Sequence, residues 1–154
     1  MLSARLVLSI LLLVAVAGAL WWTAALGPGG TNDQALVTGP FDAYVVGPEG
    51  EPLGNGTVLA RGTPLDVLDA LAATRGFGVE VDQQTWVGSG CTAAYVVGIA
   101  GHRETGTGGW NYYTRQVGQD WAWRSAGAAC YRLSAGEQVE WCWVEADACR
   151  HHVP

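Results

Sequence analysis

The sequence predicts an α+β fold in which a single helix packs on a small β-sheet. One stretch near residue 70 repeats apolar side chains at three- and four-residue spacing, which is typical of a helix with one buried face. The stretches on either side are rich in β-branched and aromatic residues and are bounded by glycine-rich turns, which is typical of strands. A helix with one apolar stripe has to bury that stripe, and a sheet is the only large partner that the sequence offers.

An apolar segment precedes this domain. Residues 6–26 carry no charge, and about 20 apolar residues suffice to cross a bilayer as a helix. Arg5 on one side and the pair Trp21 and Trp22 near the other match the positive-inside rule and the aromatic belt of membrane helices. A cleavable signal peptide usually has a shorter apolar region, but small residues within the segment would also permit cleavage. Residues 1–26 are therefore expected to form an N-terminal apolar helix, either a signal anchor with its N-terminus inside the cell or a signal peptide of a secreted protein.

Charge excludes one class of partner. The chain of 154 residues has a net charge of −6, and its eight basic residues are all arginines that form no cluster. Binding to nucleic acid requires clustered positive charge, so no nucleic-acid partner is expected. The absence of lysine is typical of GC-rich bacterial genomes.

The first part of the domain is predicted to be a hairpin. Residues 27–40 are polar and rich in glycine, which predicts a linker, and residues 41–46 are predicted to form the first strand. Residues 47–56 are almost all turn formers, with Asn55-Gly56 as the strongest turn dipeptide. Residues 57–60 would then return as the second strand.

The helix has the clearest local signals. Thr63 is expected at the N-cap, with Pro64 at the first helical position and Asp66 completing a pattern similar to a capping box. Arg75 suits the last turn, and Gly76 is placed to end the helix in the left-handed conformation. The expected buried face consists of Leu65, Leu68, Leu71 and Ala72.

Four further strands are predicted in the second half of the domain, over residues 78–82, 93–99, 110–115 and 138–144, with a loop over 83–92. The last three of these strands are expected to lie in one sheet. Both faces of 93–99 lack charge, which favours a central position. The expected buried positions in the last two strands are Trp110, Tyr112, Thr114, Val139, Trp141 and Trp143.

Segments 63–71, 95–101, 109–112 and 133–143 together resemble, in this order, the transcobalamin-like C-terminal domain family, a group of mostly uncharacterised bacterial exported domains. The resemblance covers residues 41–145 and implies a β-grasp-like domain with one helix on a mixed sheet. Residues 146–154 are expected to form a C-terminal tail. Two departures are evident. Residues 114–116 replace the Asn-Gly turn expected after the Trp-x-Tyr strand, and the large helical domain that accompanies this module in vitamin B12 carriers is not found, so cobalamin binding is not carried over.

The four cysteines, Cys91, Cys130, Cys142 and Cys149, are compatible with a metal site or with two disulfides. Structural zinc sites usually contain cysteine pairs two to four residues apart, and this sequence has none. An exported domain favours disulfides. Three pairings are possible, and the preferred one joins Cys91 to Cys130 and Cys142 to Cys149.

Trp121 and Trp123 are the strongest candidates for a binding site. They flank Ala122 in a polar stretch and would project to one side of an extended chain, where they could stack on a sugar ring or on a partner surface. The competing interpretation is that they merely cover the sheet. Tyr113 on a neighbouring predicted strand completes the set of candidate ligand-binding residues.

No pattern of catalytic or metal-binding residues emerges. His102 lies in a predicted turn, the pair His151-His152 lies in the tail, and nothing in the spacing selects a catalytic pair from the carboxylates Asp82, Asp120, Glu137 and Glu140. We therefore expect no catalytic residues, no metal and no cofactor. The sequence predicts an extracytoplasmic module that binds a small molecule, a glycan or a surface protein. The alternative is a secreted carbohydrate-binding accessory or enzyme domain that uses Trp121 and Trp123.

Overall fold

The computed structural model of the protein describes residues 37–85 and 91–145. The chain divides into two units, Met1–Gln34 and Ala35–Pro154, and the described residues all belong to the second unit. The predicted apolar helix over residues 6–26, most of the linker and the tail with Cys149 lie outside the described residues. Within the described part of the chain, no helix is long and apolar enough to cross a membrane.

The domain is of mixed α+β class, with two sheets and, among the described residues, one helix. It opens with a hairpin of β1 (Thr38–Val46) and β2 (Pro52–Arg61). The two strands are antiparallel, and their register runs from Thr38 opposite Arg61 to Val46 opposite Pro52. Both strands were predicted from the sequence, and both are longer than expected.

The predicted turn at Asn55-Gly56 is wrong, because both residues lie inside β2, opposite Tyr44 and Ala43. The chain reverses earlier, where the Gly47 amide donates to the Glu51 carbonyl at 2.8 Å. Gly50 adopts the left-handed conformation in this turn, with φ of 81°.

The helix α2 spans Pro64–Arg75 and confirms the predicted caps. The Thr63 hydroxyl accepts a hydrogen bond from the Asp66 amide at 3.1 Å, and Gly76 ends the helix with φ of 79°. Its buried residues are Pro64, Val67, Leu68, Leu71 and Ala72. The predicted buried face is wrong at one position: Leu65, which was expected to be buried, is half-buried, and Val67 is buried in the core instead.

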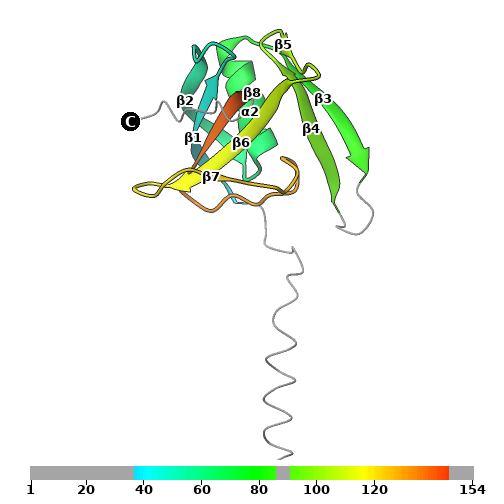
Figure 1. Ribbon diagram of the computed structural model, residues 1–154. Coiled ribbons are helices and arrows are strands. Elements are labelled where there is room, and N and C mark those ends of the chain that lie inside the picture. Colours follow the sequence, from blue (N-terminus) through cyan, green and yellow to red (C-terminus); the bar gives the residue numbers. More distant parts are fainter. Residues whose placement is uncertain (1–36, 86–90, 146–154) are drawn as a thin grey trace, which may run out of the picture. The chain divides into compact units, whose positions relative to one another are not determined.

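The main sheet contains five strands in the order β2-β1-β8-β6-β7. Its later strands are β6 (Gly108–Gln116), β7 (Ala122–Trp123) and β8 (Glu137–Glu145). β8 runs parallel to β1, and all other neighbours are antiparallel, so the sheet is mixed. Figure 1 shows α2 behind the strands, and the helix contacts β2, β1 and β8. Side chains from this helix-facing side of the sheet form the core, among them Phe41, Val45, Val139, Trp110 and Trp141.

A second sheet has the order β3-β4-β5, formed by β3 (Val79–Thr85), β4 (Thr92–Ile99) and β5 (His102–Arg103). The expectation that the strand over 93–99 shares a sheet with 110–115 and 138–144 is therefore wrong. β3 pairs along one edge of β4 and the short strand β5 pairs with Gly98 and Ile99 at the other, so β4 is a central strand as predicted, but in a different sheet from β6. Its outer side is not fully buried, since Tyr95 is 41% exposed.

The predicted disulfide between Cys91 and Cys130 is confirmed. It joins the residue before β4 to the segment between β7 and β8, with Cα atoms 5.9 Å apart. The disulfide thus connects the second sheet to the chain that returns to the main sheet. Cys142 is also disulfide-bonded, and Cys149, which was predicted as its partner, lies outside the described residues.

Candidate ligand-binding surface

The main sheet has one face toward α2 and one face away from it, which we call the outer face. Side chains alternate between the two faces along each strand. In β6, Trp110, Tyr112 and Thr114 are buried on the helix side, as predicted, and the residues between them are less buried. The outer face therefore carries, among others, Tyr44, Asn111, Tyr113, Arg115, Gln138 and Glu140.

A row of polar side chains crosses the outer face. The Thr57 hydroxyl donates to one oxygen of Asp42 at 2.6 Å, and the Gln138 amide donates to the other at 3.1 Å. Arg115 then donates from Nε to the Gln138 carbonyl oxygen at 2.7 Å. These bonds join β2, β1, β8 and β6 and fix the guanidinium group of Arg115 in position.

Trp121 is held against this row. The Arg115 guanidinium carbon lies 4.4 Å from the centre of the Trp121 ring, which is within range of a cation–π interaction. Tyr44 meets the same indole edge to face, with ring centres 6.2 Å apart. Trp121 is half-buried as a result, and its contacts match the interpretation that it covers the sheet.

Trp123 lies on the same face but in a different environment. It stands directly opposite Tyr113 in the β6–β7 pair, so the two side chains share the outer face. Its side chain is 57% exposed, whereas Tyr113 is half-buried. The structure thus brings the three candidate residues Tyr113, Trp121 and Trp123 onto one surface and leaves Trp123 as the exposed aromatic group.

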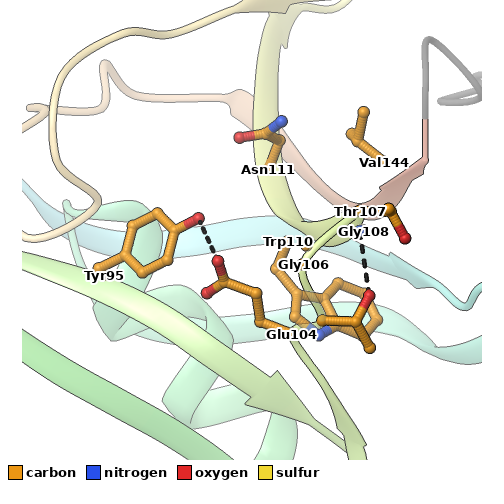
Figure 2. A pocket seen from close by; sticks show the side chains of 10 residues that line it. Tyr95, Glu104, Gly106, Thr107, Gly108, Trp110, Asn111 and Val144 are labelled. Carbon is orange, nitrogen blue, oxygen red and sulfur yellow. Dashed lines mark hydrogen bonds between the residues drawn. The ribbon is translucent and has the colours of Figure 1, made fainter.

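A small pocket lies beside this surface (Figure 2). It has a volume of about 230 Å³ and is lined by Tyr95 from β4, Glu104 from the turn after β5, Asn111 from β6 and Val144 from β8. A Cβ atom built on Gly109 would lie 3.4 Å from Glu104 Cγ and 3.7 Å from the Tyr95 hydroxyl, so both side chains approach the outer side of β6. The sequence predicted only a turn here, because the pocket forms when Tyr95 of β4 and Val144 of β8 come to lie beside residues 104–111.

The pocket is polar and carries a negative charge. The Tyr95 hydroxyl donates to Glu104 Oε1 at 3.4 Å, and the pKa of Tyr95 is raised by burial and then by the adjacent Glu104. The basic side chains next to Glu104 along the chain contact other carboxylates among the described residues: Arg103 pairs with Glu80, and the His102 imidazole lies 3.6 Å from Glu51. None of these pairs neutralises Glu104, so its carboxylate remains available as a hydrogen-bond acceptor.

Glycines shape the turn that closes the pocket. The Thr105 amide donates to the Gly108 carbonyl at 2.9 Å, and the Gly108 amide donates back to the Thr105 hydroxyl at 3.1 Å. A Cβ atom on Gly108 would lie 2.6 Å from the Trp143 ring, so no larger residue fits without a shift of that indole. The turn is therefore held by the two hydrogen bonds between Thr105 and Gly108 and by the packing of Gly108 against the Trp143 ring.

The carboxylates considered from the sequence do not form a catalytic pair in the described part of the chain. Asp82 and Asp120 are exposed and lie on different elements. Glu137 and Glu140 are buried, but side chains alternate along β8, so they lie on opposite faces. Among described side chains, no group of three or more His, Cys, Asp or Glu lies close enough to hold a metal ion.

Glu137 has a structural environment that the sequence did not indicate. Its carboxylate accepts hydrogen bonds from the Tyr131 hydroxyl and from the Ser134 amide, both at 2.9 Å, and Arg124 lies 3.7 Å away. These contacts tie the segment before β8 to the sheet. Glu137 is buried, which its position directly before the predicted strand over 138–144 did not indicate.

Comparison of the chain with protein-family models and with curated protein sequences found no match.

Proposed function

We propose that residues 41–145 form a β-grasp-like binding module of the transcobalamin-like C-terminal kind, with no catalytic activity. The order of elements supports this assignment: a β-hairpin is followed by a helix, and the last strand, β8, runs parallel to β1 in the middle of the sheet. The second sheet of β3, β4 and β5 lies between the helix and β6 in the sequence, so it is an elaboration of this arrangement. The family assignment rests on the motifs in the sequence and on this topology.

The module acts outside the cytoplasm in our proposal, either tethered to the membrane through residues 6–26 or secreted after cleavage. The disulfide between Cys91 and Cys130 supports this location, because such bonds persist in oxidising compartments. The mass of the mature protein separates the two options, since cleavage would remove the apolar segment.

The binding surface is the outer face at β6 and β7. One observation carries this proposal: Trp123 is 57% exposed and stands opposite Tyr113 on a face where Trp121 is already packed. Large exposed aromatic side chains in such a cluster are typical of interaction sites, because they offer a wide apolar area at little cost in conformational entropy.

Thermal unfolding of the full chain in mild detergent tests the proposal. The ligands are a panel of neutral oligosaccharides, cobalamin and short peptides. A ligand present at about 100 times its dissociation constant should raise the free energy of unfolding by about 2.7 kcal/mol. The Trp123→Ala variant should lose this gain and still fold.

Leu59→Ala is the matched control. Leu59 is 78% exposed on β2, at the opposite edge of the same sheet, so its removal deletes exposed apolar surface away from the proposed site. The control should keep the full effect of the ligand. A ligand that stabilises the Trp123→Ala variant as much as the parent would show that binding occurs elsewhere, and a panel without any stabilising ligand would contradict the binding role.

The alternative of a secreted carbohydrate-binding accessory uses the same aromatic surface, and the polar pocket beside Asn111 favours it over an enzyme domain. A glycoside hydrolase would need two carboxylates at a common site, and Glu137 and Glu140 lie on opposite faces of β8.

A further inference from the structure

We infer that the outer face of β6 binds a neutral β-1,4-linked oligosaccharide, with one sugar in the pocket of Tyr95, Glu104 and Asn111 and a neighbouring sugar on Trp123. This inference rests on the proposed function, since Trp123 belongs to both, and it adds the class of ligand and the second half of the site.

The pocket and Trp123 form one continuous surface. Asn111 lines the pocket, and Tyr113 follows it on the same face of β6 with Trp123 opposite. Two residues along a strand span about 7 Å and neighbouring strands lie about 5 Å apart, so the backbone of Asn111 and that of Trp123 are separated by about 8 Å along the diagonal. A ligand that uses both places must therefore extend beyond one ring.

The chemistry of the pocket suits hydroxyl groups. Its volume of about 230 Å³ lies below the range of about 300–1,000 Å³ that is usual for sites of larger, mostly apolar ligands. Glu104 accepts hydrogen bonds, the Asn111 amide both donates and accepts, and the Tyr95 hydroxyl, which donates to Glu104, can accept another. A sugar presents groups that donate and accept at neighbouring positions, so it can satisfy all three side chains at once.

Other small polar ligands fit less well. An anion would be repelled by Glu104, which has no ion-pair partner among the described residues. An ammonium group would satisfy Glu104, but it only donates hydrogen bonds and would leave the donor groups of Asn111 unused. The nearby indole of Trp123 adds a flat apolar surface, which suits the C–H face of a pyranose ring whose substituents are all equatorial, as they are in β-1,4-linked glucose or N-acetylglucosamine.

Isothermal titration calorimetry of the full chain in mild detergent tests this inference with cellohexaose and chitohexaose as probes and α-linked maltohexaose as comparator. At least one β-1,4-linked hexaose should bind more tightly than maltohexaose, and it should bind more tightly than the corresponding disaccharide. Glu104→Gln should weaken binding about tenfold, because hydrogen bonds to a carboxylate are about twice as strong as neutral ones. Asn111→Ala and Trp123→Ala should also weaken it.

Asp69→Asn is the control for charge, since it removes one exposed carboxylate on α2, which packs on the face of the main sheet opposite to the pocket. Its affinity for the hexaose should equal that of the parent chain. Glu104 is exposed, so its replacement by glutamine should leave the fold intact, as circular dichroism would verify.

The possible failures are distinguishable. If neither β-linked hexaose binds while cobalamin or a peptide stabilises the protein through Trp123, the inference is overturned and the proposed binding function stands. If a hexaose binds through Trp123 with an affinity that Glu104→Gln and Asn111→Ala leave unchanged, the pocket is not part of the site. Tighter binding of a polyamine such as spermidine, lost in Glu104→Gln, would overturn the choice of a neutral sugar.

Discussion

Removal of the disulfide between Cys91 and Cys130 should lower the free energy of unfolding by about 4 kcal/mol. The two residues are 39 positions apart, and the loop-closure entropy for a loop of this length gives about 4 kcal/mol at 25 °C. A domain of ordinary stability has about 5–15 kcal/mol in total, so this single bond is a large part of it. Reductant would also break the bond of Cys142, so alanine variants give the cleaner measurement.

Urea unfolding of the full chain, followed by far-ultraviolet circular dichroism, measures this loss for Cys91→Ala, Cys130→Ala and the double variant. The midpoint should fall by about 2 M, since a domain of this size has a slope of about 2 kcal/mol per molar urea. Either single substitution already removes the bond, so all three variants should lose the same amount. Losses below about 1 kcal/mol, or single losses that add up in the double variant, would show that packing and not the cross-link accounts for the effect.

Three further predictions concern stability. Thr63→Ala should cost about 1 kcal/mol in chemical unfolding, because the Asp66 amide loses its capping acceptor, whereas Thr63→Ser should be nearly neutral. Burial raises the pKa of the Tyr112 hydroxyl, so the neutral phenol stabilises the fold fully below about pH 10 and this contribution is lost as the pH rises above it. Alkaline unfolding of Tyr112→Phe, followed by circular dichroism, should therefore depend less steeply on pH than that of the parent chain. Trp121→Ala should lower the free energy of unfolding by about 1–2 kcal/mol, whereas Trp123→Ala should change it by less than about 0.5 kcal/mol, and equal losses would contradict the assignment of Trp121 to packing and Trp123 to binding.

The helix could be predicted closely because its signals are local. Thr63, Pro64 and Gly76 act within one turn of their own positions, and neighbouring residues cannot easily override them. The alternating burial of β6 was predictable for the same reason. Only the choice between Leu65 and Val67 on the buried face depended on how α2 is rotated against the sheet.

The hairpin turn was harder because two segments compete for it. Gly47 to Glu51 and Asn55-Gly56 both have favourable turn chemistry, and local propensity does not rank them. The structure uses Gly56 for a different purpose, since a Cβ there would lie 3.0 Å from Arg75 Nη2, and Arg75 donates a hydrogen bond to the Asn55 carbonyl. The missing side chain at Gly56 thus lets Arg75, at the end of α2, approach β2. The sequence does not indicate this contact, because it forms only when the helix packs on the sheet.

Sheet membership was predicted wrongly: β4 was expected beside the more distant strands β6 and β8, whereas it pairs with its neighbours in the chain, β3 and β5. The strand β4 pairs with β3 along its length and with β5 at Gly98 and Ile99, and its apolar residues do not themselves distinguish these partners from β6. Tyr95 and Glu104 meet beside Asn111 only after both sheets have formed.

Trp121 and Trp123 show what the alternation of side chains along an extended chain can predict and what it cannot. It places Trp121 and Trp123 on one side of the chain, and the structure has both on the outer face. The alternation does not distinguish the two residues. Trp121 is half-buried because it contacts Tyr44 and Arg115 from two other strands, whereas Trp123 lies on the edge strand β7 opposite Tyr113. A substitution at Trp121 therefore reports on stability as well as on binding. Trp123 is the position at which binding can be changed while the fold is preserved, and the choice between an interaction surface and a covered sheet depends on it.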